Sequence, residues 1–177
     1  MTDPLLQRFT QEIMPQKNIA AGVGLDIACG SGRDLIYLAT QGWDMTGIDR
    51  SAASLQQAQQ LANDSNIAIN THEIGMETGA NPFSDFPKHS FDLVTVSRYL
   101  HRPLFPYIKA LIKPGGILLY QTFMMGCELS EIGHPRNPNF LLKPSELANT
   151  FSDTELLVNE ETTTEDGRPF ALFIARL

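Results

Sequence analysis

A glycine-containing turn between an apolar strand and a helix carries the clearest chemical signal in the chain. Val23–Ala28 is an apolar run typical of a buried strand, Cys29-Gly30-Ser31-Gly32 follows it, and a helical pattern begins near Arg33. Glycines let the chain turn sharply and let a ligand lie against bare backbone. The start of the helix adds unpaired N–H groups and the positive end of a dipole. The segment therefore predicts a ligand-binding turn.

The spacing in this turn argues against a dinucleotide site. The fingerprint Gly-x-Gly-x-x-Gly needs a third glycine where the helix packs on the strand, and Leu35 stands there. Asp26 has no place in that fingerprint either, because it puts a carboxyl group inside an apolar strand. A buried lone carboxylate is costly, so we expect Asp26 to accept hydrogen bonds from the turn or to bind the charged end of the ligand.

Polar side chains are dense after a later apolar run, Phe91–Val96. Ser97-Arg98-Tyr99-Leu100-His101-Arg102 follows, and in open α/β sheets ligands bind outside the carboxyl ends of the strands. In the functional interpretation Tyr99 and His101 face the substrate, with His101 as a base or an orienting group, and Arg102 attracts an anion. In the structural interpretation His101 holds the start of the next helix, and Arg102 is solvated.

A second candidate region is the loop Glu131–Phe140, which leaves the fifth predicted strand at the same edge of the sheet. Long loops in small domains are often functional, so this loop either covers the substrate or is an ordered surface loop. The basic residues of the two regions would make a locally positive mouth in an acidic protein: Arg98, Arg102, His134 and Arg136.

Alternating strands and helices must position these residues. Strand-like runs cover Val23–Ala28, Trp43–Ile48, Ile67–Ile74, Phe91–Val96, Ile117–Phe123, Glu155–Thr163 and Pro169–Arg176, the last two around an Asp-Gly turn. Helical patterns include Leu5–Ile13, ended by Pro15, Ala52–Asn63, Pro103–Ile112, ended by Pro114-Gly115-Gly116, and Pro144–Thr150. The pattern predicts an α/β fold: a Rossmann-like, seven-stranded sheet, mostly parallel with a C-terminal antiparallel hairpin, and helices on both faces.

Composition limits the classes of protein to which the chain can belong. Its 177 residues give one domain over residues 1–177, with an N-terminal helix within residues 1–20 as a candidate lid. The net charge of −7 argues against a general binder of nucleic acid or anionic membranes. No apolar stretch has the length of a membrane span or the pattern of a signal peptide, so we expect a cytoplasmic protein. Two cysteines are too few for a disulfide scaffold or a four-thiolate zinc site, and we predict no metal.

Five segments, taken in order, resemble the motifs of the class I S-adenosylmethionine (SAM)-dependent methyltransferases. They are Leu25–Gly32, Asp49 nineteen positions after Gly30, Glu73-Ile74-Gly75, Phe91–Val94 and Lys113–Gly116. Each segment alone is weak, but their order and spacing over nearly the whole chain are specific. Gly30–Asp34 with Tyr37–Ala39 resembles, more closely, the small bacterial tellurite-resistance-like methyltransferases.

This resemblance implies SAM as the cofactor. Asp49 would bind the ribose hydroxyls, because a carboxylate can accept two hydrogen bonds. Ile74 and the stem of Arg50 would contact the adenine, while Glu73 is a looser match because Asp is usual there. The implied cofactor-binding residues are Asp26, Ala28, Gly30, Gly32, Asp49, Arg50, Glu73, Ile74 and Ser97.

The same resemblance implies an enzyme that transfers a methyl group to a small-molecule or oxyanion acceptor, because little chain lies outside the core to dock a macromolecule. A soft acceptor needs only alignment, whereas an oxygen or nitrogen acceptor also needs a base. Two alternatives stay open: a non-catalytic SAM-binding sensor or subunit, and a tRNA or protein methyltransferase. Ser97-Arg98-Tyr99-Leu100 stands where nucleic-acid amine methyltransferases have Asn-Pro-Pro-Tyr or Asp-Pro-Pro-Tyr, which argues against that class.

Overall fold

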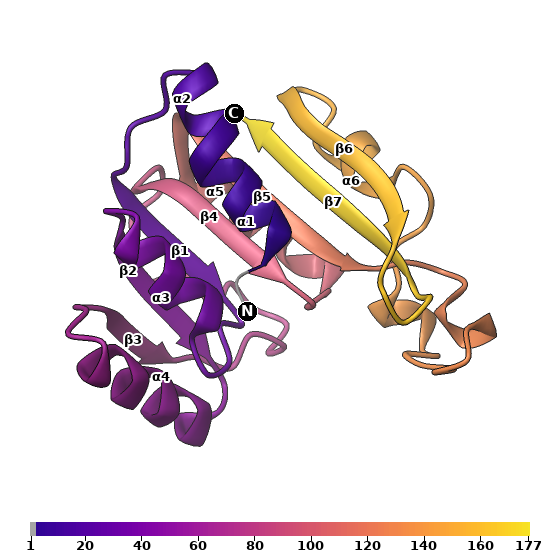
Figure 1. Ribbon diagram of the computed structural model, residues 1–177, viewed down its shortest axis with the longest axis horizontal. Coiled ribbons are helices and arrows are strands. Elements are labelled where there is room, and N and C mark those ends of the chain that lie inside the picture. The colour runs from indigo at the N-terminus through magenta and orange to yellow at the C-terminus, as the bar shows by residue number, and fades with distance from the viewer. Residues whose placement is uncertain (1–2) are drawn as a thin grey trace.

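Seven strands form one mixed sheet in the computed structural model, which describes residues 3–177 (Figure 1). In chain order they are β1 (Val23–Ile27), β2 (Asp44–Asp49), β3 (Asn70–Glu73), β4 (Phe91–Ser97), β5 (Ile112–Phe123), β6 (Glu155–Thr163) and β7 (Pro169–Arg176). Across the sheet the order is β3-β2-β1-β4-β5-β7-β6. Strands β1 to β5 pair in parallel, and β7 is antiparallel to both β5 and β6. The predicted fold class is confirmed.

Helices cover both faces of this sheet. They are α1 (Pro4–Arg8), the π-helical turn η1 (Phe9–Ile13), α2 (Met14–Gln16), α3 (Arg33–Thr40), α4 (Ala52–Asp64), α5 (Phe105–Leu111) and α6 (Glu146–Thr150), with 3₁₀ turns η2 (Arg102–Leu104), η3 (Cys127–Leu129) and η4 (Pro138–Phe140). One core packs Leu6 and Phe9 with Leu35, and the other packs Ile108 with Leu147. In Figure 1, α1 and α3 lie in front of the sheet and α5 behind it. No helix among residues 3–177 is long and apolar enough to cross a membrane.

The order of the strands reverses beside β1. The chain runs from β1 outward to β2 and β3 and then returns to β4, which pairs with the other edge of β1. The segments that follow β1 and β4 therefore leave the sheet toward opposite faces. This is the switch point at which open α/β sheets bind ligands.

Pro15 does not end the first helix, contrary to the prediction. The helical chain continues through η1 to Gln16, and the N–H of Met14 donates to the carbonyl of Phe9 in the wider π pattern. Pro15 is therefore the last residue but one of a continuous helical segment that ends at Gln16.

The first helical segment packs on the sheet and on the C-terminal hairpin. Leu5 and Phe9 are buried, and the Phe9 ring lies 6.2 Å from that of Trp43. Arg8 and Lys17 form ion pairs with Glu160 and Glu155 of β6, at 2.7 and 3.1 Å. The predicted lid role of residues 1–20 stays a prediction, and residues 1–2 lie outside the described part of the chain.

Two strands differ from their predicted bounds by more than one residue at an end. β5 begins at Ile112, which pairs with Phe91, and pairing resumes only at Ile117 with Leu93. The predicted turn Lys113–Gly116 is therefore an irregularity within β5, with Gly115 at φ +79°. β3 is shorter than the predicted Ile67–Ile74 because it is an exposed edge strand with only one neighbour.

Candidate functional site

Three cavities lie side by side at the carboxyl ends of β1, β2 and β4. The turn cavity, of about 260 Å³, is lined by residues that include Asp26, Gly30, Arg33, Ser97 and Arg98. The Asp49 cavity, of about 390 Å³, is lined by residues that include Asp49, Arg50, Met76, Glu77 and Thr78. The Phe123 cavity, of about 270 Å³, is lined by residues that include Leu100, Thr122, Phe123, His134 and Arg168.

Shared lining residues connect the three cavities. Ala28 borders the turn cavity and the Asp49 cavity, and Arg98 borders the turn cavity and the Phe123 cavity. Tyr99 and Phe140 border both the Asp49 cavity and the Phe123 cavity. The arrangement is one cleft with three parts, placed where the strand order reverses.

Asp49 holds the turn after β1 against the turn after β2. One of its carboxylate oxygens accepts the N–H of Gly30, and the other accepts the N–H of Ser51, both at 2.9 Å. Each oxygen keeps a further lone pair, so Asp49 can still accept a hydrogen bond from a ligand hydroxyl. Asp49 thus lies at the predicted end of β2. It also stabilises the two turns through their backbone amides, a role that the sequence did not reveal.

The two turn glycines have different duties. Apart from its chain neighbours, no atom of residues 3–177 would lie within 4 Å of a Cβ on Gly30 (φ +54°), so open space lies beside this backbone. A Cβ on Gly32 (φ +82°) would lie 2.6 Å from the Cβ of Ala58 on α4. Its N–H already donates to the carbonyl of Cys29. Gly30 therefore faces the cavity, whereas Gly32, predicted as a second contact for the ligand, allows close packing of α4.

Asp26 is a buried acid beneath the turn. Its side chain is 2% exposed and accepts a hydrogen bond from Thr95 Oγ1 at 3.0 Å. Burial, with a smaller contribution from the negative charge of Asp34, raises the pKa of Asp26 to about 8. The raised pKa is typical of a carboxyl group that needs a cationic partner to ionise fully.

Tyr99 lies on the wall between two cavities. Its hydroxyl donates to Glu77 at 3.2 Å, and its carbonyl accepts from the hydroxyl of Tyr120 at 2.8 Å. Burial and the neighbouring carboxylate raise the pKa of Tyr99. The phenol therefore stays protonated at neutral pH and acts as a hydrogen-bond donor.

Arg102 is engaged with the protein itself. Its guanidinium forms a two-point ion pair with Glu146 at the start of α6. It also donates to the carbonyls of Leu141, at 2.8 Å, and Asn139, at 3.3 Å. Arg102 lines none of the three cavities. Arg102 therefore anchors the segment that carries Phe140. The prediction that Arg102 attracts an anion does not fit this geometry, because its guanidinium is already paired.

Other predicted residues lie just outside the lining. His101 is half-buried before η2, and its carbonyl accepts the N–H of Leu104. Glu73 is exposed at the end of β3, and the N–H of Ile74 donates to the carbonyl of Asp49. The segment that follows Glu73 and Ile74, Gly75–Thr78, lines the Asp49 cavity instead. Gly75 ends the predicted segment Glu73-Ile74-Gly75, whereas Met76–Thr78 carry no motif by which the sequence could have indicated them.

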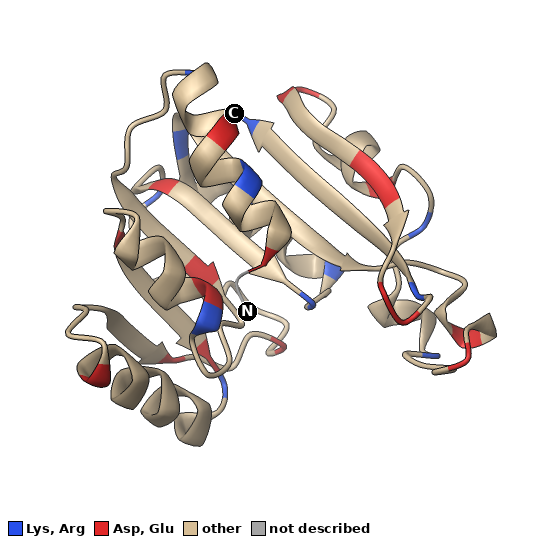
Figure 2. Cartoon of the chain, viewed as in Figure 1, with Lys and Arg blue, Asp and Glu red and all other residues tan. Residues whose placement is uncertain are grey.

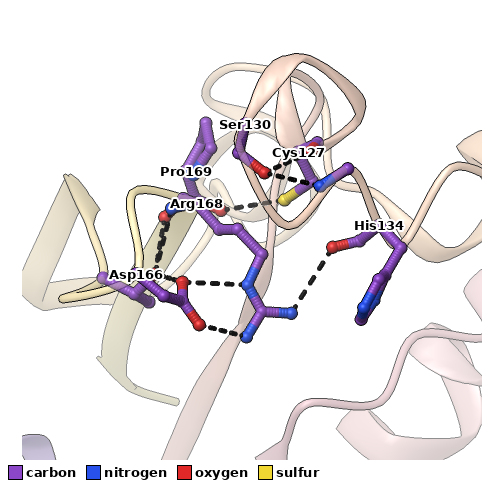
Figure 3. Close-up of polar contacts among 8 residues, drawn as sticks. Cys127, Ser130, His134, Asp166, Arg168 and Pro169 are labelled. Carbon is purple, nitrogen blue, oxygen red and sulfur yellow. Dashed lines mark hydrogen bonds and ion pairs between the residues drawn. The ribbon is translucent and has the colours of Figure 1, made fainter.

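The wall of the Phe123 cavity joins the predicted loop Glu131–Phe140 to the hairpin turn. Arg168 forms a two-point ion pair with Asp166 at 2.6 and 2.9 Å and donates to the carbonyl of His134 at 3.4 Å (Figure 3). Its guanidinium also lies 4.2 Å from the centre of the Phe123 ring. Sequence reasoning missed Arg168, because nothing local links it to a loop 34 positions earlier.

Comparisons with known proteins place this arrangement in a family. The model of a family described as "Methyltransferase domain" matches residues 25–116. A ubiquinone biosynthesis O-methyltransferase of Histophilus somni is 31% identical over 103 residues, which cover 55% of this chain and 43% of that protein. The chain spans less than two thirds of the length of the first curated relatives that it matches.

Solved structures agree in fold. TehB from Haemophilus influenzae superposes with a TM-score of 0.72 at 22% identity, over 97% of this chain and 66% of that one. Magnesium protoporphyrin IX methyltransferase from Synechocystis, with bound SAH, gives a TM-score of 0.71 at 15% identity, over 97% and 80%. The resemblance to class I methyltransferases, and with it SAM as the cofactor, is confirmed. On the match over residues 25–116, the chain belongs to the methyltransferase domain family.

Proposed function

We propose that the chain is an enzyme that transfers the methyl group of SAM to a small-molecule acceptor bound in the Phe123 cavity. The observation that carries this proposal is the shared wall: Tyr99 and Phe140 border both the Asp49 cavity and the Phe123 cavity. Two small molecules can therefore bind next to each other at the edge of the sheet. Cavities of about 260–390 Å³ suit molecules of this size and not a macromolecule.

The residues present fit SAM. Gly30 leaves open space beside the backbone, so a ligand can approach the turn closely. Asp49 keeps lone pairs for the ribose hydroxyls, and the buried Asp26 suits the α-ammonium group. When bound, SAM supplies an electrophilic methyl group: an acceptor lone pair forms the new bond to carbon, sulfur keeps the electrons of the broken bond, and the acceptor proton leaves to a base or to water.

The chain itself contributes mainly binding and alignment. Asp49 fixes two turns through backbone amides, and Tyr99 and Phe140 form the wall at which cofactor and acceptor would meet. Tyr99, with its raised pKa, is no base at neutral pH. Alignment of two bound reactants supplies effective molarities on the order of 10⁵–10⁸ M. An acceptor that is already nucleophilic or easily deprotonated needs only this alignment.

The relatives support a small acceptor in general terms. Several are named ubiquinone biosynthesis O-methyltransferases, whose acceptor by that name is a small molecule. Their similarity covers about half of this chain, so the acceptor itself is not transferred to it.

Two measurements on the same preparation test the proposal. Calorimetric titration with S-adenosylhomocysteine should show binding, and release of S-adenosylhomocysteine from SAM should appear with one or more members of a panel of phenols, thiols, carboxylic acids and oxyanions. Absence of S-adenosylhomocysteine binding to the folded protein would overturn the cofactor site. Tight binding without turnover across the panel would favour a SAM-binding sensor over an enzyme.

A further inference from the structure

We propose that Arg98 selects acceptors that carry an anionic group, such as a carboxylate, on an apolar body. This inference rests on the proposed function and specifies its acceptor. It follows from the position of Arg98, from the state of the other cationic side chains near the Phe123 cavity, and from the apolar side chains in the lining of that cavity.

Arg98 stands where the cofactor and acceptor parts of the cleft meet. It lines both the turn cavity and the Phe123 cavity, and it is exposed. Within residues 3–177 its guanidinium has no carboxylate within 4.0 Å and makes no hydrogen bond. The nearby acids of the turn cavity are otherwise engaged: Asp34 pairs with Arg33, and Asp26 is buried on Thr95. Arg98 therefore presents an uncompensated positive charge to the cleft.

The other arginines near the Phe123 cavity are occupied. Arg102 is paired with Glu146, and Arg168 with Asp166. The Nε of Arg136 donates to the carbonyl of Gly133, and Arg136 lines none of the three cavities. Of the four basic residues that would form a positive mouth, the structure leaves Arg98 and His134 in the lining.

The backbone fixes the starting direction of the Arg98 side chain. Arg98 has φ +54°, a left-handed conformation that costs a residue with a Cβ about 1–2 kcal/mol. Its N–H donates to the carbonyl of Gln121 on β5 at 2.8 Å, and the buried Gln121 side chain donates to Ser97 Oγ. These contacts, at Ser97 and at the N–H of Arg98 itself, hold the start of the turn, so the Arg98 side chain leaves the end of β4 at a defined point.

Apolar side chains make up a second part of the lining. Leu100, Phe123, Pro135 and Phe140 line the Phe123 cavity together with the polar residues Thr122, His134 and Arg168. The Phe123 ring contacts the Arg168 guanidinium, 4.2 Å from its centre, and the ring of Phe170, whose centre lies 5.1 Å away. A bare oxyanion would leave this surface without contact, whereas a carboxylate on a ring or short aliphatic body would use both the charge and the wall.

Matched acceptors make the proposal testable. Each pair shares a nucleophile and a ring but differs in a carboxylate or a carboxamide, for example a hydroxybenzoate and its amide. Arg98→Asn and Arg98→Gly remove the charge while tolerating the left-handed backbone. Lys88→Ala removes one charge from an exposed position outside the cleft lining.

We expect both Arg98 variants to raise KM for the carboxylate by about 10- to 100-fold, the size of a lost charged hydrogen bond, and to change KM for the amide little. Lys88→Ala should leave both values unchanged. Titration of benzoate into the protein without cofactor should give the same contrast between wild type and the Arg98 variants, which provides a readout independent of turnover.

Two outcomes would overturn the proposal while leaving the proposed function intact. In one, carboxylate and amide lose the same factor in folded Arg98 variants. In the other, S-adenosylhomocysteine affinity falls and the acceptor preference does not change, which would assign Arg98 to the cofactor. If the wild-type protein neither bound S-adenosylhomocysteine nor turned over any acceptor, the proposed function itself would be rejected.

Discussion

The two sides of the cleft are built in different ways. On the β1–β2 side, short hydrogen bonds to backbone amides fix the turns, as Asp49 does with Gly30 and Ser51. On the β4–β7 side, side chains join segments far apart in sequence, as Arg102 does with Glu146, 44 positions later. Figure 2 shows acidic segments where β1 and β2 end and mostly uncharged ribbon along β5 and β7. The first side is held by a local backbone motif and the second by side chains from distant segments; under the proposed function the first would bind the cofactor and the second the acceptor.

The largest expected effect separates the two glycines of the turn. Gly32→Val should destabilise the fold by about 3 kcal/mol or more, because the new side chain collides with Ala58 and has to adopt a left-handed backbone. Gly30→Ala should cost about 1–2 kcal/mol of stability yet weaken S-adenosylhomocysteine binding. Chemical denaturation and calorimetry on each variant measure the two effects.

Gly167→Ala provides the matched control for the backbone cost, since Gly167 has φ +83°, no neighbour within 4 Å and a place in the hairpin turn. Its stability should fall like that of Gly30→Ala, with S-adenosylhomocysteine affinity unchanged. If Gly32→Val folded normally and lost only affinity, the assignment of Gly32 to helix packing would be wrong.

The next effect concerns Asp49. Asp49→Ala removes acceptors for two backbone amides and for ligand hydroxyls, so S-adenosylhomocysteine affinity should fall by about 10- to 100-fold and stability should also decrease. Asp44→Ala, an exposed acid at the other end of β2, should change neither. Wild-type affinity in folded Asp49→Ala would remove Asp49 from the site.

Asp26 should make stability depend on pH. Because its pKa is raised to about 8 in the fold, against about 4 in the unfolded chain, the unfolded chain releases a proton that the fold retains. Stability should therefore fall as pH rises from about 4 to about 8. Asp26→Asn keeps the acceptor for Thr95 but cannot ionise, so its curve should be flatter and lie above that of the wild type near pH 8.

Urea unfolding at pH 5, 7 and 8.5 tests this, with Asp44→Asn as an exposed control. The same Asp26→Asn variant should bind S-adenosylhomocysteine more weakly, because the ammonium group loses its anionic partner. Parallel stability curves for Asp26→Asn and wild type would contradict the raised pKa.

A smaller effect is expected on the acceptor wall. Arg102→Ala should cost about 1–2 kcal/mol of stability and raise acceptor KM more than it weakens S-adenosylhomocysteine binding, because it frees the segment that carries Phe140. Lys109→Ala breaks an exposed ion pair with Asp153 and should cost under about 1 kcal/mol. Equal losses in the two variants would show that the Arg102 anchor is not needed.

The smallest effect is expected at His101. A catalytic base at this position would mean a loss of about 10²–10⁴ in turnover for His101→Ala. His101 lines none of the three cavities, so we expect near-normal turnover per folded molecule and a lower melting temperature. A large loss of single-turnover rate at unchanged stability would restore the catalytic interpretation.

Local sequence was sufficient for the sheet and the cofactor turn. Apolar runs and helical periods depend on neighbouring residues, and the hairpin limits Glu155–Thr163 and Pro169–Arg176 agree with the observed strands. The sequence also singled out Asp26, Gly30 and Asp49, which line the cleft in the structure, and their contacts with a cofactor stay predictions.

Tertiary structure decided the duties of individual side chains. Gly32 packs against α4, and Arg102 is neutralised by Glu146, 44 positions later, which no spacing rule links to it. Arg168 pairs with Asp166 of its own hairpin turn, but it also joins this turn to the distant carbonyl of His134. Arg98, which the sequence ranked with three other basic residues, lies at the junction of two cavities and has no carboxylate within 4.0 Å among residues 3–177. The reason is physical: whether a charge is available to a ligand depends on which distant groups the fold brings within hydrogen-bond distance, and a linear pattern does not contain those distances.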